Sequence, residues 1–240
     1  MKWNVAVYLI AGIMLSESSE MYLQAILRLS EKNNEVTIGQ IAQAMGYSLS
    51  TVSEKVKKLT DQGLLLHEWR EGVALSEEGR RIAAKLLRKR RLIETFLVRM
   101  AGYSPYEVYQ DACRLEHVVS ERLTEALDRI LEYPARDPHG HPIPSAEGTL
   151  RAKKTFPLSA IDTGIEVKIW AISTTDIEKM KYIDQLGFKP DKTCRIMEKA
   201  PFDGPLIIAM NNRNVPVAQS LASYIEVETI DSQKQCYDEQ

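Results

Sequence analysis

Residues 37 to 75 constrain the fold most strongly, because they specify four short elements in a fixed order. Thr37-Ile38-Gly39-Gln40 is a capping box, and Gly46 ends the helix that it begins. Ser48 begins a second helix, whose buried stripe is Val52, Val56 and Leu59. Two short apolar segments on either side of Arg70-Glu71-Gly72 predict a hairpin. This order of helix, turn, polar-faced helix and hairpin indicates a winged helix-turn-helix.

The helix after Ser48 leaves its polar side chains facing outward, which suits contact with DNA. Small hydroxyl side chains allow close approach to phosphates and thymine methyl groups, and lysines neutralise phosphate charge. The predicted DNA-binding residues are Ser48, Ser50, Thr51, Ser53, Glu54, Lys55, Lys58 and, in the hairpin, Arg70. A small helical bundle with a solvated lysine face has the same outline. The hairpin directly after the helix favours DNA binding.

Cys113-Arg114-Leu115-Glu116-His117 is a candidate metal site. On a helix, positions 113, 116 and 117 face the same way, so a thiolate, a carboxylate and an imidazole converge. Met21 can supply a thioether as a fourth donor if the first helix, near residues 18 to 31, packs against this one. The competing interpretation is a small core cysteine beside two solvated neighbours, because one three-donor turn is a weak motif.

Further helices are expected around this motif, and a separate β-rich region follows it. Ser76 begins a helix that extends to about Met100, and Ser104-Pro105-Tyr106-Glu107 begins the helix that carries Cys113. More apolar helix faces are present than one small domain needs, which favours a homodimer. Residues 134 to 148 are rich in Pro and Gly and mark a boundary, in which His139 and His141 are weak metal-ligand candidates. Short strands and one helix then predict a small SH3-like barrel.

The expected fold class is therefore mainly α with a small amount of β. The chain divides into an uncertain N-terminal extension (1–13), a winged helix-turn-helix DNA-binding domain (14–76) and a helical metal-binding and dimerisation domain (77–134). A linker (135–154), the SH3-like domain (155–229) and a polar tail (230–240) complete it.

Charge and cysteine content limit the function classes. The formal net charge is -2, so DNA binding requires a local concentration of Lys and Arg. Three widely spaced cysteines, at positions 113, 194 and 236, argue against a disulfide framework and for a reducing cytoplasm. Residues 4 to 15 are apolar but well short of the roughly 20 residues that span a bilayer, so no membrane association is expected. Met14 is an alternative translation start. If translation begins at Met1 instead, we expect residues 1 to 13 to pack on the rest of the protein.

The sequence resembles the diphtheria toxin repressor family of metal-dependent transcriptional regulators from about residue 16 to residue 229. The matching stretches are Glu20-Met21-Tyr22-Leu23, the helix-turn-helix, residues 111 to 118 and residues 137 to 144. The resemblance implies a winged helix, a helical metal-binding and dimerisation domain, and an SH3-like domain. It makes Met21, Cys113, Glu116 and His117 the activating metal site.

The donor types distinguish this chain from the manganese-type members of that family. Those members carry a carboxylate at the position of Met21, Glu at Gln24, His at Arg90 and Glu at Cys113. Thioether and thiolate donors suit a late divalent metal better than Mn(II), which prefers oxygen. Fe(II) is the expected effector, because metal availability in the cell, rather than affinity, determines which metal binds. Mn, Co, Ni or Zn are able to substitute.

Iron-type relatives also have an ancillary metal site, and the residues at its positions here are Arg90, Glu94, Tyr109, Ala171 and Thr174. Only Glu94 matches. We expect that the ancillary site is lost, that Arg90 replaces its cation by pairing with Glu94, and that one metal binds per subunit. The alternative is an ordinary exposed ion pair of little energetic value.

The resemblance implies a homodimer that binds a double-stranded DNA operator when metal fixes the first helix, as a repressor of metal-uptake genes. Glu54 stands where relatives often have a Gln that contacts DNA, which leaves the operator preference open. No enzyme activity is expected, because the chain has no H-E-x-x-H, nucleophile-elbow or phosphate-loop motif. A metal-independent DNA binder, a metalloenzyme and a metal-transport accessory protein are the alternatives, the last because the SH3-like domain resembles ferrous-transport modules.

Overall fold

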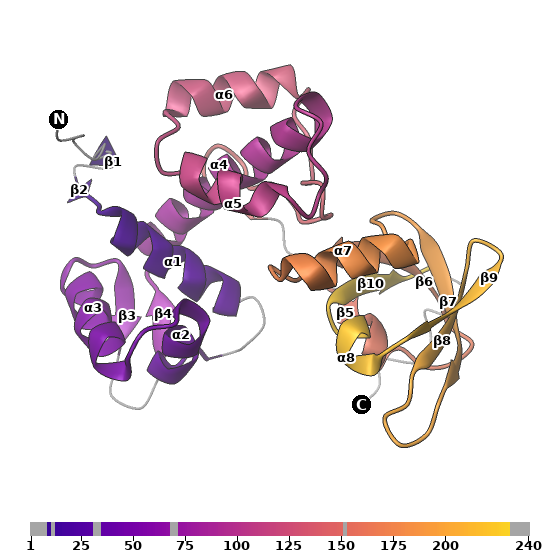
Figure 1. Cartoon of the computed structure of the whole chain (residues 1–240). Coiled ribbons are helices and arrows are strands. Elements are labelled where there is room, and N and C mark those ends of the chain that lie inside the picture. Colours follow the sequence, from indigo (N-terminus) through magenta and orange to yellow (C-terminus); the bar gives the residue numbers. More distant parts are fainter. Residues whose placement is uncertain (1–8, 11–12, 31–34, 68–71, 151–152, 231–240) are drawn as a thin grey trace. The chain divides into compact units, whose positions relative to one another are not determined.

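The computed structural model describes residues 9–10, 13–30, 35–67, 72–150 and 153–230 (Figure 1). They form two compact units. The first comprises Met1–Phe96, Gln110–Pro134 and Ile143–Arg151, and the second comprises Leu97–Tyr109, Ala135–Pro142 and Ala152–Gln240. Each unit has a hydrophobic core of its own.

The first unit begins with the predicted winged helix-turn-helix. Two short paired strands, β1 (Leu9–Ile10) and β2 (Ile13–Met14), precede α1 (Glu17–Ser30). The helix-turn-helix and its hairpin are α2 (Ile38–Met45), α3 (Leu49–Asp61), β3 (Leu65–His67) and β4 (Val73–Leu75). The buried stripe predicted for α3 is confirmed, since Val52, Val56 and Leu59 are fully buried.

Side-chain caps determine where α2 and α3 begin. Thr37 Oγ1 accepts a hydrogen bond from Gln40 N at 3.2 Å, and Gln40 Oε1 accepts one from Thr37 N at 2.8 Å. Ser48 Oγ accepts from Thr51 N at 3.2 Å. Gly46 adopts a left-handed backbone with a φ of 70°, which a residue without a Cβ tolerates best. These local interactions end α2, turn the chain and present the polar face of α3.

Three further helices follow the hairpin: α4 (Glu77–Met100), α5 (Val108–Leu115) and α6 (Glu121–Ile130). The prediction that the helix of Cys113 begins at Pro105, after a cap at Ser104, was wrong by three residues, because the helix begins at Val108. Ser104 N does donate to Glu107 Oε2 at 2.9 Å, but residues 105 to 107 form a turn. At the other end, Glu116 N still donates to Ala112 O at 3.0 Å. Glu116 therefore keeps a helical position although α5 ends one residue earlier.

The second unit contains an antiparallel sheet of six strands in the order β5-β10-β6-β7-β8-β9. The strands are β5 (Phe156–Pro157), β6 (Glu166–Ile172), β7 (Thr193–Lys199), β8 (Leu206–Met210), β9 (Arg213–Val217) and β10 (Ile225–Thr229). The helical elements are a 3-10 helix (Leu158–Ala160), α7 (Ile177–Leu186) and α8 (Gln219–Ala222). Asp176 caps α7 and Gly187 ends it, as their residue types indicate. This architecture is the expected small SH3-like domain.

The sequence pattern predicted neither edge strand of this sheet. β5 is only two residues long, and β9 contains Pro216, which cannot donate a backbone hydrogen bond and is tolerated only at a sheet edge. Among the helices that the structure describes, none has the length and apolar character that a bilayer crossing requires.

Candidate metal centre

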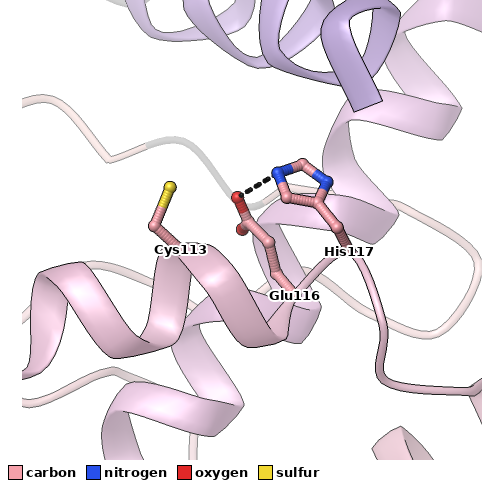
Figure 2. A group of neighbouring side chains, drawn as sticks. All are labelled: Cys113, Glu116 and His117. Carbon is pink, nitrogen blue, oxygen red and sulfur yellow. Dashed lines mark ion pairs between the residues drawn. The ribbon is translucent and has the colours of Figure 1, made fainter. Parts of the chain in front are cut away.

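Cys113, Glu116 and His117 form a compact cluster at the end of α5, in the first unit. Their ligand atoms all lie within 4.8 Å of one another. Glu116 and His117 are buried and Cys113 is half-buried. Figure 2 shows the Cys113 thiol and the Glu116 carboxylate projecting to the same side of the helix, with the His117 ring beside the carboxylate. The structure thus brings together three of the four residues predicted as metal ligands.

A buried carboxylate on α1 orients the His117 ring. His117 Nδ1 lies 2.6 Å from Glu20 Oε2, while Nε2 faces Glu116 Oε1 at 3.5 Å. An ionised carboxylate only accepts hydrogen bonds, so Nδ1 carries a proton, and Nε2 is the nitrogen that faces the cluster and offers a lone pair to a metal ion once its own proton is released. This is the arrangement of a metal-ligating histidine, whose outer nitrogen is held by a carboxylate.

Sequence reasoning missed Glu20. The available signal was its position, because Glu20 lies immediately before Met21 and on the buried face of an amphipathic helix. An acidic side chain in such a place is rarely buried without a partner.

The surroundings of the cluster perturb both of its buried titratable groups. Burial alone would lower the pKa of His117, but contacts with Cys113, Glu20 and Glu116 outweigh it and raise that pKa to about 10. Burial raises the pKa of Glu116, and the Arg90 guanidinium opposes that shift. His117 is therefore charged at neutral pH in the metal-free cluster, and ligation of a metal ion must release its proton.

Arg90, on α4, lies on the other side of Glu116. Its Nη1 donates to Gln24 Oε1 at 2.9 Å, and its Nε lies 3.8 Å from Glu94 Oε1 and 3.9 Å from Glu116 Oε2. All four side chains are buried. Arg90 and Glu94 are thus not an exposed surface pair. They belong to a buried network that also includes Gln24 and a predicted metal ligand.

One carboxylate oxygen of this network fits a role for the cluster in holding a cation. Among the described buried side chains, Gln24 Nε2 and Glu116 Oε2 have no hydrogen-bond partner. A buried polar atom without a partner costs about 1–3 kcal/mol. Coordination of a divalent cation would remove that cost at Glu116. The donor set of thiolate, carboxylate and imidazole fits a late divalent metal.

The remaining predicted ligand positions differ in placement. Met21 is 38% exposed and follows Glu20 directly on α1, so its role as fourth donor stays a prediction. Tyr109, Ala171 and Thr174 belong to the second unit, and the buried side chain of Ala171 carries no ligand atom.

A second cluster, Asp137, His139 and His141, also has ligand atoms within 4.8 Å of one another. Asp137 Oδ1 accepts hydrogen bonds from the backbone nitrogens of His139 and His141, both at 2.9 Å. His139 Nε2 lies 2.8 Å from Pro105 O, and His141 Nε2 lies 3.0 Å from Ser173 Oγ. These bonds fasten residues 137 to 141 to other parts of the second unit.

The predicted DNA-binding residues form the outer face of α3. Ser48, Ser50, Thr51, Ser53, Glu54 and Lys58 are exposed, whereas Arg70 lies outside the described residues. Lys55 is half-buried, and its Nζ donates to Ser19 Oγ on α1 at 2.8 Å. One residue predicted to contact phosphate therefore links α3 to α1.

Apolar side chains on and around α5 and α6 are left uncovered. The exposed ones are Leu115, Val118, Leu123 and Ile130. Such a set is what a helical dimer interface buries.

Family models match three consecutive parts of the chain. Residues 14–73 match the N-terminal DNA binding domain of iron dependent repressors, and residues 76–145 match their metal binding and dimerisation domain. Residues 156–229 match the FeoA domain.

Individual relatives are similar over nearly their whole length. The iron-dependent repressor IdeR of Mycobacterium leprae is 29% identical over 228 residues, which are 90% of this chain and 99% of that protein. The diphtheria toxin repressor of Corynebacterium diphtheriae is 28% identical over 224 residues, with the same two coverages. A solved structure described as a manganese-dependent transcriptional repressor in complex with manganese matches with a TM-score of 0.83 and 34% identity. That match covers 88% of this chain and 100% of the other.

Proposed function

Because the chain belongs to the iron-dependent repressor family of metal-dependent transcriptional regulators, we propose that one Fe(II) ion per subunit activates it for operator binding. The ion is held by Cys113, Glu116 and His117 together with Met21. The observation that carries this assignment is the buried cluster itself, in which Glu116 Oε2 has no hydrogen-bond partner. A bound divalent metal supplies there the positive charge that satisfies the thiolate and the carboxylate.

The donor set supports iron over manganese as the effector. Relatives named as iron-dependent and solved structures named as manganese-dependent are both similar to this chain, so overall similarity does not separate the two types. Sulfur donors at positions 21 and 113 favour Fe(II) over Mn(II), which prefers oxygen ligands. Other late divalent metals, Co, Ni and Zn, satisfy the same donors in vitro.

Contacts within the first unit provide a route from the metal centre to the DNA-binding face. α1 carries Glu20 and Met21, and it packs against α2 and β4. Lys55 connects α3 to Ser19 on α1, and the Tyr47 ring, just before α3, stacks on Tyr22 at 6.2 Å between ring centres. When α1 is fixed against α5, α3 is fixed with it.

In a dimer, fixing α3 in both subunits sets the spacing of the two recognition helices. Successive major-groove faces on one side of DNA lie about 34 Å apart. The conformation with the DNA-competent spacing must bind metal more tightly than the conformation without it. A metal ion with equal affinity for the two conformations would not change their populations. The residues that create this difference in affinity are those that α1 adds to the cluster of α5.

We assign no activating role to the ancillary positions. Arg90 places a permanent positive charge beside Glu94 and Glu116, where a second cation would otherwise be needed. In this proposal residues 14–76 bind DNA, residues 77–134 bind metal and form the dimer, and the SH3-like domain of residues 155–229 supports them without binding the activating metal.

Cobalt binding tests the ligand assignment. Titration of the metal-stripped full chain with Co(II) is expected to give a thiolate-to-cobalt absorption band that saturates at about one ion per subunit. Cys113→Ser should abolish the band. Cys194→Ser is the matched control and should retain it, since burial and Glu166 raise the pKa of Cys194 to about 12. A band that survives Cys113→Ser would exclude this thiol as a ligand.

A further inference from the structure

We propose that Arg90 and Gln24 form a metal-independent clamp that holds α1 against α4, so that the metal-free protein retains part of its operator affinity; this rests on the proposed function. Gln24 lies on α1 and Arg90 lies on α4, 66 residues further along the chain. The side chains of both are almost fully buried, and Arg90 Nη1 donates to Gln24 Oε1 at 2.9 Å. A buried hydrogen bond with a charged donor is at the strong end of its range.

A second contact anchors the same face of α1. Glu20 is four residues before Gln24, so both side chains project from one side of the helix. Glu20 accepts a hydrogen bond from His117 Nδ1 at 2.6 Å, and this nitrogen is the one that does not face Glu116. Two anchors one turn apart oppose both sliding and rotation of α1. Neither anchor uses the ligand atoms that face the centre of the cluster.

The charge of Arg90 explains why this clamp does not require metal. Glu94 and Glu116 are both buried, and each has an oxygen within 4 Å of Arg90 Nε. A guanidinium is always charged, so it compensates these carboxylates at any metal concentration. The 3.9 Å separation from Glu116 Oε2 is too long for a hydrogen bond, which leaves this oxygen available to a metal ion. The clamp and the metal can therefore act together.

The consequence concerns the size of the metal response. α1 is linked to α3 through Ser19 and Lys55, so a clamped α1 already favours the DNA-competent arrangement. Metal binding then further shifts a conformational equilibrium that the clamp has already shifted toward the DNA-competent arrangement. The clamp lowers the ratio of metal-saturated to metal-free operator affinity without lowering the metal-saturated affinity.

Gln24→Leu tests the clamp because it removes the acceptor of the Arg90 hydrogen bond at nearly constant volume. Operator binding of the full-length dimer is measured by fluorescence anisotropy, with and without saturating Fe(II), under anaerobic conditions. We expect the metal-free affinity to fall about tenfold and the Fe(II)-saturated affinity to stay within about twofold. Gln110→Leu is the matched control, since Gln110 is exposed on α5 and its replacement should change neither value. Gln24→Glu should restore the metal-free affinity, because its carboxylate still accepts from Arg90.

Hydrogen exchange of the metal-free protein gives a readout that does not involve DNA. α1 should lose protection in Gln24→Leu and keep it in Gln24→Glu. Unchanged metal-free affinity together with unchanged exchange in Gln24→Leu would overturn the clamp. Equal losses of affinity with and without Fe(II) would also overturn it, because they indicate general destabilisation. A wild-type affinity that ignores Fe(II) would instead refute the proposed function, and the exchange data would still decide the clamp.

Discussion

The two histidine and carboxylate clusters of this chain differ in what holds their donor atoms. Cys113, Glu116 and His117 meet partners from α1 and α4, up to 97 residues away, and Glu116 Oε2 has no hydrogen-bond partner. Asp137, His139 and His141 lie within five consecutive residues, and Asp137 Oδ1 and both histidine Nε2 atoms form hydrogen bonds. The ligand atoms are equally close together in both. Proximity of possible metal-ligand atoms therefore does not distinguish a regulatory metal site from a loop that hydrogen bonds hold in place.

The distinguishing features are the distance in sequence between the parts that a cluster joins and the polar atoms that it leaves unsatisfied. A bound ion in the first cluster would change how α1 sits on α5. An ion in the second would mainly reinforce a turn that hydrogen bonds already hold. We therefore expect metal to regulate through the first cluster.

The largest expected effect is on metal binding by Cys113→Ala. Loss of the thiolate should weaken Fe(II) or Co(II) binding by about 100-fold or more and abolish metal-stimulated DNA binding. His139→Ala is the corresponding change in the second cluster and should leave the metal response within about twofold of wild type. Isothermal titration calorimetry of both variants checks this. Equal losses in the two variants would erase the distinction between the clusters.

The second prediction concerns pH. The pKa of His117 is raised to about 10, so its charged form stabilises the metal-free fold fully below its ordinary pKa. That contribution is lost as pH rises toward 10. Metal competes with this proton and with that of the Cys113 thiol, so it should bind up to about 100-fold more tightly for each unit of pH between 6.5 and 8. Calorimetry in buffers of different ionisation enthalpy should show up to about two protons released per metal ion, one from His117 and one from Cys113. Affinity independent of pH would contradict the assignment of His117 as a ligand.

A third prediction addresses how Glu20 positions His117. Glu20→Ala removes the acceptor for His117 Nδ1 and should weaken metal binding by about 10- to 100-fold. Glu20→Gln keeps an acceptor oxygen and should recover most of that loss. Purely structural damage would leave both variants equally impaired and would lower their thermal stability together.

The smallest effect is expected from His139→Ala on the stability of the second unit. The substitution removes the hydrogen bond with Pro105 O and should lower the free energy of unfolding by about 1–2 kcal/mol. Chemical denaturation of the metal-free protein measures this change. If added metal raised the stability of the wild type but not of His139→Ala, the second cluster would be a metal site as well.

Local signals in the sequence predicted much of the fold. Thr37 and Ser48 form the expected caps, Gly46 ends α2, and the exposed face of α3 follows from its spacing. The ends of α5 were less predictable, since a capping hydrogen bond at Ser104 does not by itself start a helix. β9 was missed because it contains Pro216, which argues against a strand unless the strand lies at a sheet edge, and the sequence does not show that β9 is an edge strand.

The candidate site was predictable only in part. The spacing of Cys113, Glu116 and His117 on one turn is a local pattern, and the structure shows these residues together. Glu20 and Gln24 were not identified as its partners, because only tertiary packing brings α1, which carries them, to the cluster. The burial of Arg90 was equally hidden, since a run of basic residues on a helix usually faces solvent.

Operator binding by the anaerobic, metal-stripped dimer, measured on the region upstream of its own gene with and without Fe(II), tests the central claim most directly. We expect measurable binding without metal and an increase of about tenfold or more with Fe(II). Cys113→Ala should lose the increase but keep the metal-free level. Identical wild-type binding in both conditions would contradict a metal-gated repressor.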